Sequence, residues 1–372
     1  MINIGITGQA GFIGTHLYNF FGLQKDRVSR ISFQDDYFSD TNKLEAFVKQ
    51  CNVIIHLAAL NRHNDPQTIY DTNILLVQKL IAAMEKSGSS PHVLFASSIQ
   101  EERDNVFGKS KRDGRKLLAS WAKKNHAFFT GLIIPNVFGP FGNPFYNSVV
   151  ATFCHQLTHS EGPRIEIDAK LKLIYIGELV TIIDEIISKQ LAAETYKVSP
   201  TAEKKVSEIL DQLNRFKSEY FDKGQFPDLR DSFKINLFNT FRCYMDIPVY
   251  YPVKLAQHKD ERGSFVETLK TRIGGQFSFS VTRPGITRGN HFHTRKIERF
   301  AVIKGKARIQ LRRIGTPEII SFDLDGIKTA YVDMPVWYTH NITNTGDEDL
   351  YTLFWINEFY DPDDPDTYYE EV

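Results

Sequence analysis

The chain has 372 residues, among which 45 lysines and arginines balance 45 aspartates and glutamates. This length exceeds one ordinary hydrophobic core and favours two or three domains, while the balanced charge provides no overall field for nucleic acid or an anionic membrane surface. The three cysteines, Cys51, Cys154 and Cys243, are odd in number and widely spaced, which argues against a disulfide framework or a cysteine-based metal site. No apolar segment is long enough to span a bilayer.

The N-terminal segment has the pattern of a nucleotide-binding loop. Met1 leads directly into the apolar run Ile2 to Thr7, without a basic stretch, signal core or cleavage site, so we expect a cytoplasmic protein. A glycine-rich segment follows, and apolar residues then continue at helical spacing. Glycines at such a turn let the backbone approach a pyrophosphate, whose charge the helix N-terminus favours. The expected contacts come from Gly8, Gly11, Phe12, Ile13 and Gly14.

Strand-like and helix-like segments alternate through the first part of the chain. The expected strands are residues 28–33, 53–58, 93–98 and 130–135, and the expected helices begin near residue 42 and cover about 70–86 and 110–124. Such alternation predicts a parallel sheet covered on both faces, a Rossmann-type doubly wound fold. Further on we expect helices at 148–157, from 178, at 202–216 and at 232–242, with short strands at 164–167 and 171–175. These elements complete a first domain of residues 1–245.

Several segments of this domain resemble the extended short-chain dehydrogenase/reductases that act on nucleotide sugars. They are His56-Leu57-Ala58-Ala59, Asn73, Ser97-Ser98, residues 108–111 and residues 135–140. The resemblance implies that Leu57, Ala58 and Ala59 lie at the cofactor, with Asp40 near its adenine. It also implies that Ser98 and Lys111 occupy two of the three catalytic positions, Lys111 contacting the cofactor as well.

The third catalytic position departs from that family. Its members have a tyrosine four residues before the lysine, which donates a proton to the carbonyl that receives hydride, whereas this chain has Phe107. A phenyl ring cannot donate a proton, so the reaction must use Ser98, water or another residue, or must have been lost.

The choice between NAD(H) and NADP(H) stays open on the sequence. The second strand ends in Ser32-Phe33-Gln34-Asp35-Asp36, where an acid would suit a free ribose hydroxyl and an arginine would suit a 2′-phosphate. Arg30 is expected to precede the strand end, so the local residues favour NAD(H).

The second part of the chain, residues 246–372, has the sequence pattern of an antiparallel barrel. After the proline-rich connector 248–252, short strands are expected at 277–282, 300–303, 308–312, 318–322, 330–332 and 351–355. The acidic tail from Asp361 to Asp366 is expected to be a solvated terminus.

Two clusters in this part predict a metal site. His291 and His293 are two residues apart and so share one face of a strand, while Glu298 follows on the next strand and His340 comes from a second cluster at 335–344. Three imidazoles and a carboxylate suit one borderline divalent cation, zinc first, and leave room for water or a substrate oxygen. This two-part pattern resembles the cupins, which bind one metal in the mouth of a small jelly-roll barrel. Trp337 stands where their pattern usually has glycine.

The pair of domains resembles the CapF-type bifunctional enzymes of capsular polysaccharide and O-antigen synthesis over nearly its full length. Similar runs include residues 146–154, 304–306, 338–342 and 365–368. The resemblance implies that the cupin epimerises C3 of a UDP-2-acetamido-2,6-dideoxy-hexos-4-ulose and that the first domain then reduces the C4 ketone with NADPH. Tyr338, on the same face of its strand as His340, is the first candidate to move the C3 proton, although a core tyrosine would show the same pattern. The family also implies a homodimer joined through the cupin.

Three interpretations remain on the sequence. The first is the bifunctional epimerase and reductase. The second keeps the epimerase and gives the first domain little or altered activity because of Phe107. The third is a nucleotide-binding scaffold without catalysis, dimerised by a metal cupin, against which an open coordination position counts.

Overall fold

The structure is a computed structural model that describes residues 1–255, 257–260, 263–266, 268–271, 275–358 and 361–372. The chain forms two compact units, and we describe each by itself. The first comprises residues 1–138, 145–148 and 169–205, and the second comprises residues 139–144, 149–168 and 206–372. This division differs from the predicted boundary at residue 245, because residues 206–245 pack within the second unit.

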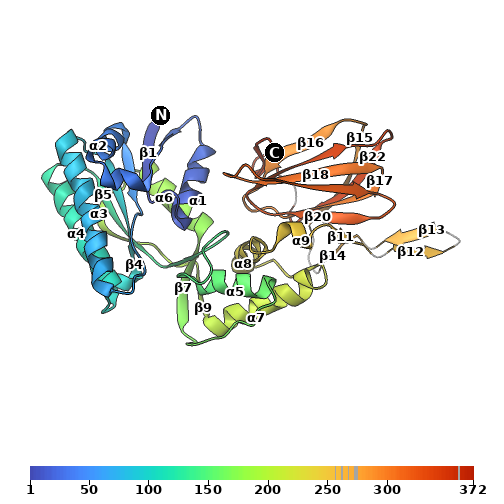
Figure 1. The fold of residues 1–372 in the computed structure, drawn as a ribbon, viewed down its shortest axis with the longest axis horizontal. Coiled ribbons are helices and arrows are strands. Elements are labelled where there is room, and N and C mark those ends of the chain that lie inside the picture. The colour runs from blue at the N-terminus through green and yellow to red at the C-terminus, as the bar shows by residue number, and fades with distance from the viewer. Residues whose placement is uncertain (256, 261–262, 267, 272–274, 359–360) are drawn as a thin grey trace. The chain divides into compact units, whose positions relative to one another are not determined.

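The first unit contains the predicted parallel sheet with helices on both faces, which confirms the Rossmann-like fold (Figure 1). Each neighbouring pair of its six strands is parallel. In spatial order the strands are β2 (Val28–Ile31), β1 (Ile2–Thr7), β3 (Val53–His56), β4 (His92–Ser98), β5 (Phe129–Ile134) and β8 (Ala193–Lys197). The chain reverses its direction of winding at β1 and β3, so the segments that follow these strands meet at the place where such sheets bind ligands.

Polar residues begin the helices that cover one face of this sheet, α2 (Thr41–Gln50), α3 (Pro66–Ser87) and α4 (Val106–Lys124). Asp40, Asp65 and Asn105 each accept a hydrogen bond from a backbone N–H of the first turn. Their apolar sides enclose a core that includes Phe47, Phe95 and Trp121. Helices α1 (Phe12–Gly22) and α6 (Ile176–Ser188) cover the other face (Figure 1). No described helix is both long and apolar enough to cross a membrane.

Two secondary-structure predictions were wrong, one for residues 202–205 of the first unit and one for residues 164–167 of the second unit. Residues 202–205 form strand β9 (Ala202–Lys205), antiparallel to β7 (Lys170–Tyr175), which also pairs with β6 (Asn136–Phe138). Alanine, glutamate and lysine favour helices, but pairing with β7 overrides that weak preference. Residues 164–167 form no strand and are exposed, so an apolar side chain such as Ile167 is not buried.

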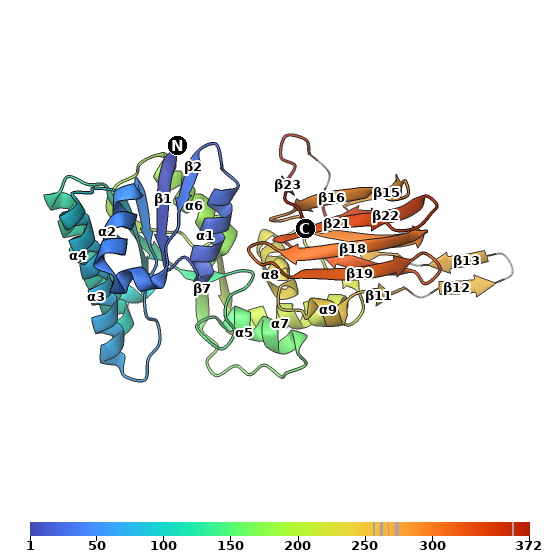
Figure 2. The same ribbon diagram turned by 45° about the horizontal axis from the view of Figure 1, so that its top comes forward.

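The second unit contains an antiparallel β-sandwich, which confirms the all-β, cupin-like fold (Figure 2). One sheet has the order β11 (Val253–Lys254), β20 (Ala330–Met334), β17 (Glu298–Lys304), β22 (Leu350–Ile356) and β15 (Gln276–Thr282). The other has the order β19 (Ile319–Asp325), β18 (Lys306–Arg313), β21 (Tyr338–Asn344), β16 (Thr287–Phe292) and β23 (Tyr368–Tyr369). Val302, Ile309 and Ile342 are among the buried residues of the core.

Shorter elements complete both units. The first unit also has η1 (Asp35–Ser39) and η2 (Ile99–Glu102). The second unit has α5 (Val149–Thr158), α7 (Val206–Phe216), η3 (Lys217–Phe221), β10 (Gln225–Phe226), α8 (Ser232–Arg242), α9 (Ile247–Tyr250), the hairpin β12 (Gln257–Asp260) with β13 (Gly263–Val266), and β14 (Lys270–Thr271) beside β10.

A buried ion pair explains why residues 206–252 belong to the second unit. Asp333 on β20 is fully buried and accepts hydrogen bonds from Arg299 Nε at 2.7 Å and Nη2 at 3.0 Å. The hydroxyl of Tyr220 in η3 donates to the same carboxylate and lies 2.7 Å from the hydroxyl of Tyr251. A buried carboxylate left without these partners would be strongly destabilising, so the sheet requires the segment that supplies Tyr220 and Tyr251.

Candidate metal centre and nucleotide site

A one-residue bulge in β16 places the first histidine of the cluster. Along β16 and β21 the register pairs Gly289 with Asn341 but His291 with His340, so Asn290 is the extra residue. Gly289 and Asn290 have positive φ angles of 99° and 56°, a conformation that glycine and asparagine tolerate best. Without the bulge, His291 would point to the opposite face of its sheet from His340.

The four predicted ligands meet on the inner faces of both sheets. Their ligand atoms all lie within 4.8 Å of one another. His340 Nε2 is 3.0 Å and His293 Nε2 is 3.1 Å from Glu298 Oε2, and the rings of His291 and His340 are 4.7 Å apart. The four residues that the spacing predicted as ligands therefore lie together, and their binding of a metal stays a prediction.

The donor set fits a cation. The Nδ1 atoms of His293 and His340 face the backbone carbonyls of Asp366 and Tyr338, which can only accept, so each Nδ1 carries the hydrogen in the neutral ring. Each Nε2 then presents a lone pair toward Glu298, and the buried His293 Nε2 forms no hydrogen bond of normal geometry in the described chain. Lone pairs that face one carboxylate oxygen repel each other unless a proton or metal ion lies among them.

Burial and charge shift the pKa values of these groups. Burial lowers the pKa of His291 to about 4 and so favours the neutral form that a metal requires. Burial alone would raise the pKa of Glu298, but its contacts with His293 and His340 lower it. Burial alone would lower the pKa of His293, but Glu298 raises it.

The tail that was expected to be solvated is partly built into this site. Asp366 is buried, with 2% of its surface exposed, and β23 pairs with β16 (Figure 2). That prediction was wrong for Asp366, because the carboxylate accepts backbone hydrogen bonds that charge patterning could not foresee.

Trp337 and Tyr338 come shortly before His340 in the chain. Tyr338 lies two residues from His340 on β21, with its ring 6.3 Å from that of Phe141, and burial raises its pKa to about 12. Its role in proton transfer stays a prediction. Trp337 adopts a positive φ of 61°, which explains the glycine usual at this position, and its ring stacks on Phe292 at 5.4 Å.

In the first unit, the glycine loop lies against the segment after β3. Gly8 has a φ of 71°, and a Cβ there would come within 2.9 Å of Ala58 N, while a Cβ on Gly14 would come within 2.3 Å of Gly8 O. The backbones of the loop and of the segment therefore pack directly against each other, and the residues predicted to contact the cofactor lie together. Gly11 provides no side-chain cap for α1, and the first turn carries no acid, which suits an anion at the exposed helix N-terminus.

Asp40 has a structural role that the sequence did not suggest. Its Oδ1 accepts hydrogen bonds from Asn42 N and Lys43 N, both at 3.1 Å, and so caps α2. Its predicted place near the adenine stays a prediction.

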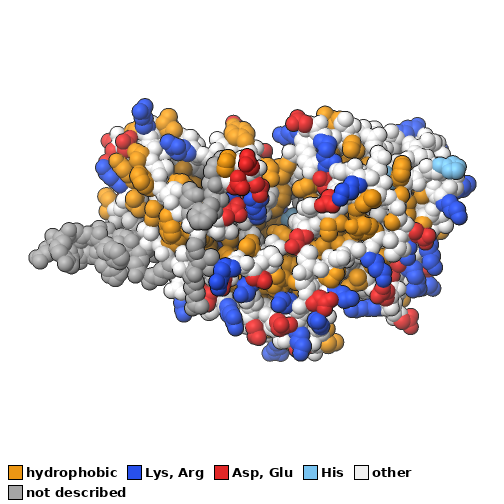
Figure 3. Space-filling model, turned by 180° about the vertical axis from the view of Figure 1, so that it is seen from behind, with side chains coloured by type: hydrophobic (Ala, Val, Ile, Leu, Met, Phe, Trp, Pro, Cys, Tyr) orange, Lys and Arg blue, Asp and Glu red, His pale blue; other side chains and the backbone are white. Residues whose placement is uncertain are grey.

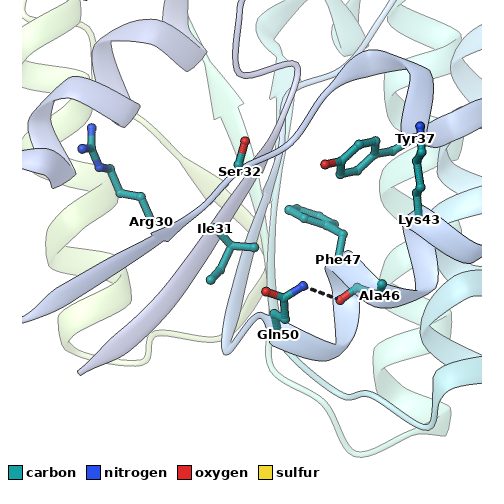
Figure 4. Close-up of a pocket in the computed structure, with 8 residues that line it drawn as sticks. All are labelled: Arg30, Ile31, Ser32, Tyr37, Lys43, Ala46, Phe47 and Gln50. Atoms are coloured by element: carbon teal, nitrogen blue, oxygen red, sulfur yellow. Dashed lines mark hydrogen bonds between the residues drawn. The ribbon is translucent and has the colours of Figure 1, made fainter.

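A cavity of about 330 Å³ lies beside the end of β2 (Figure 4). Ile31, Ser32 and Phe47 line it together with Lys43, and Arg30 lies on the other side of the strand from Lys43. Arg30 also lines the cavity, and its guanidinium group stacks on the ring of Tyr18 at 4.1 Å. None of the residues of the glycine loop lines the cavity.

Lys111 and Phe107 lie close together on α4. The Nζ atom of Lys111 is 5.8 Å from the centre of the Phe107 ring and 5.0 Å from that of Phe95, so the ammonium group is held among aromatic faces. Burial lowers the pKa of Lys111 to about 8, an effect that Glu101 opposes. A buried lysine with a depressed pKa destabilises the fold, which favours a functional role over a structural one.

Ser98 ends β4, and the segment that follows it packs closely against α4. Ser98 Oγ accepts from Gln100 N at 3.2 Å, and Gly108 permits α4 to approach Gln100, since a Cβ there would meet Gln100 O at 2.0 Å. Sequence reasoning missed the buried pair beneath this segment, in which Arg115 donates to Glu101 at 2.9 and 3.0 Å. The two residues are 14 positions apart, so no local periodicity joins them.

Comparisons with known proteins agree with the two-part architecture. Residues 4–199 match the NAD dependent epimerase/dehydratase family, and residues 258–368 match the polysaccharide biosynthesis C-terminal domain. The chain is 33% identical to UDP-2-acetamido-2,6-beta-L-arabino-hexul-4-ose reductase of Pseudomonas aeruginosa, covering 98% of this chain and 97% of that protein.

Solved structures give the same picture. The capsular polysaccharide assembling protein CapF of Staphylococcus aureus has 33% identity over 100% of both chains, with a TM-score of 0.62. RMD from Pseudomonas aeruginosa, solved with NADPH, has 19% identity over 59% of this chain and 82% of that one, with a TM-score of 0.53, which supports the fold of the first part.

Replacing Lys111 with methionine should stabilise the unliganded protein in a pH-dependent way. Since the folded pKa of about 8 lies below the unfolded value of 10.5, the wild type bears the full cost of the buried charge below pH 8 and loses it as the pH rises toward 10.5. Lys111→Met should therefore raise the free energy of unfolding by up to about 3 kcal/mol at pH 7 and by less at pH 9.5. Urea unfolding at both pH values measures this, with the exposed Lys116→Met as control; an equal gain at the two pH values would contradict it.

Replacing both His291 and His293 with alanine should remove a bound metal. Elemental analysis after dialysis against zinc should find about one equivalent in the wild type and none in the double variant. The matched control is His155→Ala with His159→Ala, a stacked pair on α5 with ring centres 4.0 Å apart. Metal retained in the first variant, or lost in the control, would place the ion elsewhere.

Proposed function

The chain belongs to the CapF-like proteins, in which an NAD dependent epimerase/dehydratase domain precedes a polysaccharide biosynthesis C-terminal domain, and on this basis we propose that it is a bifunctional nucleotide-sugar enzyme. In this proposal the sandwich epimerises C3 of a UDP-2-acetamido-2,6-dideoxy-hexos-4-ulose, and the first unit reduces the C4 ketone for the synthesis of a surface polysaccharide. The observation that carries the proposal is the convergence of His291, His293, Glu298 and His340 in a chain that also holds a glycine loop and a buried Lys111.

The epimerisation step uses the acidity of a C–H bond next to a ketone. A divalent metal held by the three histidines and Glu298 would supply a Lewis acid for the C4 oxygen, because it would stabilise the charge left when the C3 proton departs. Water or another basic group would take the C3 proton on one face of the sugar, and Tyr338, whose hydroxyl is protonated at neutral pH, is the candidate to return a proton to C3 on the other face.

The reduction step needs a hydride donor and a proton donor. The glycine loop and the uncapped N-terminus of α1 would hold the pyrophosphate of a nicotinamide nucleotide, which supplies the hydride. Lys111 brings a positive charge to the place where the family has its catalytic lysine, and Ser98 brings a hydroxyl group. Phe107 cannot complete the set, so the proton for the C4 oxygen must come from one of these groups or from water.

The end of β2 favours NADPH as the cofactor. The strand ends at Ile31, so Ser32 occupies the position where an acid would hold the ribose hydroxyl of NADH. Asp36, the second of the two acids that begin η1, is paired with Lys43 at 2.9 Å. Lys43 and Ser32 line one cavity. A cation together with a hydroxyl suits a 2′-phosphate better than it suits a free ribose hydroxyl.

Phe107 favours a second candidate function, an epimerase whose first unit has little or altered reductase activity. The wild-type protein should be incubated with the 4-keto sugar in D2O, with NADPH, with NADH and without cofactor. Deuterium at C3 reports the epimerase, and oxidation of the cofactor reports the reductase. Exchange without oxidation would select the second candidate, and absence of both would exclude either enzyme.

In the same assay, Phe107→Tyr should oxidise the cofactor at least about tenfold faster than the wild type, because a general acid contributes roughly 10²- to 10⁴-fold. The added hydroxyl would have Lys111 beside it to lower its pKa. Phe128→Tyr, on a ring that is 49% exposed, is the matched control and should change nothing. An unchanged rate at unchanged NADPH affinity would show that another group donates the proton.

A homodimer joined through the sandwich is the oligomeric state that we propose. Strand β15 lies at the edge of its described sheet, and Phe277, Phe279 and Val281 on its outer side are 52%, 68% and 37% exposed. Apolar side chains gather at the surface of this unit, on the left of the view in Figure 3. A second copy would cover such an edge.

The double variant Phe277→Ser with Phe279→Ser should weaken this dimer by at least about tenfold, because each ring loses roughly 1.5 to 3 kcal/mol of burial. Sedimentation of the full chain over a range of concentrations measures the change. Ile327→Ser, at a side chain that is 73% exposed, is the control. A monomeric wild type, or an unaffected variant, would refute this interface.

A further inference from the structure

The C-terminal segment contacts the metal-ligand strand at both of its ends. At the bulge, Glu370 N donates to Asn290 O at 3.0 Å, and β23 pairs Tyr369 with His291 and Tyr368 with Phe292. At the other end, the backbone carbonyl of Asp366 accepts from His293 Nδ1. The last residues of the chain therefore hold His291 on β16, and His293 with the turn that it begins.

Asp366 makes the most extensive of these contacts. Its Oδ1 accepts from Thr294 N at 3.1 Å and Thr294 Oγ1 at 2.6 Å, and its Oδ2 accepts from Arg295 N at 3.0 Å and Lys296 N at 2.9 Å. One buried carboxylate thus accepts hydrogen bonds from three successive backbone N–H groups in the turn between His293 and Glu298. These four hydrogen bonds fix where the two ligands stand relative to each other.

The same residue sets the tautomer of His293. A carbonyl oxygen can only accept, so the contact with Asp366 O keeps the hydrogen on Nδ1 and leaves the lone pair on Nε2, which points toward Glu298. The φ of Asp366 is 39°, a left-handed conformation in which this carbonyl and the side chain both face the turn. Outer contacts of this kind orient a ligand and raise its affinity for metal.

From these contacts we propose that Asp366 is a positioning residue for the metal ligands His293 and Glu298, and that the C-terminal segment is part of the metal site. This inference rests on the metal site of the proposed function. It assigns a role to a segment that carries no ligand and that lies more than 60 residues along the chain from the turn it holds.

Two substitutions distinguish the role of the Asp366 carboxylate from that of the Asp366 backbone carbonyl. Asp366→Gly keeps a residue that tolerates a positive φ and keeps the carbonyl, but removes the four hydrogen bonds. Asp366→Asn keeps one acceptor oxygen and replaces the other with an amide that would face N–H groups. The matched control is Asp361→Gly, because Asp361 is an exposed acid of the same tail whose side chain accepts from Asp363 N.

The affinity for Zn²⁺ of the full chain should be measured by competition with a chromophoric chelator, and the rate of zinc loss should be measured alongside it. We expect Asp366→Gly to weaken binding about 10- to 100-fold, Asp366→Asn to weaken it less, and Asp361→Gly to leave it unchanged. A purely structural role would lower the melting temperature of the metal-free protein without changing the zinc affinity of the folded chain.

Equal zinc affinity in the wild type and both Asp366 variants would overturn the proposal, and so would an equal loss in Asp361→Gly. If Asp366→Gly does not fold, Asp366→Asn and Thr294→Ala decide, since the latter removes only the hydroxyl that donates to Oδ1. Losses of a few-fold in these two variants would support the proposal, and no loss in either would overturn it. A wild type that takes up no zinc would overturn the metal site itself and this role with it.

Discussion

The cluster of three histidines and Glu298 depends on one extra residue in a strand. A β-strand alternates its side chains between two faces, and the bulge at Asn290 reverses that alternation in β16 just before His291. His291 therefore faces inward opposite His340, and Glu298 reaches the same place from the other sheet. Gly289 permits the close approach, because a Cβ there would meet His340 O at 2.8 Å. Four polar groups, three of them buried and His291 half-buried, are in this way brought together where a cation could offset the cost of removing them from water.

Two kinds of buried charge occur among the described residues. Arg299 with Asp333, and Arg115 with Glu101, have partners with good geometry, and each ties together segments that are distant in sequence. Lys111 is different, since its ammonium group lies beside the rings of Phe95 and Phe107 and burial lowers its pKa. Paired charges maintain the fold once they are buried, whereas a charge of the second kind destabilises it and is explained by a ligand or a reaction.

The division of the chain follows from the same energetics. The outer face of the sheet that contains β17 and β20 carries Arg299 and Asp333, which water cannot satisfy once they are buried. Tyr220 therefore donates a hydrogen bond to Asp333, and the hydroxyl of Tyr251 bonds that of Tyr220. The segment around η3 and α8 thus belongs to the sandwich, although its helical pattern resembles the domain before it. The last residues are held for a related reason, since they satisfy backbone N–H groups beside His293.

The sequence by itself determined what depends on short range: the glycine loop after β1, the alternation of strands and helices, and the types and spacing of the four predicted metal ligands. Periodicity and glycine positions are local properties, so they survive without knowledge of the fold. Only the tertiary structure decided that Ala202–Lys205 is a strand, that residues 206–252 cover the sandwich, and that Asp366 is buried rather than solvated. Those outcomes depend on partners far along the chain, β7, Asp333 and the turn after His293, and a side chain's own pattern carries no information about which distant group will satisfy it.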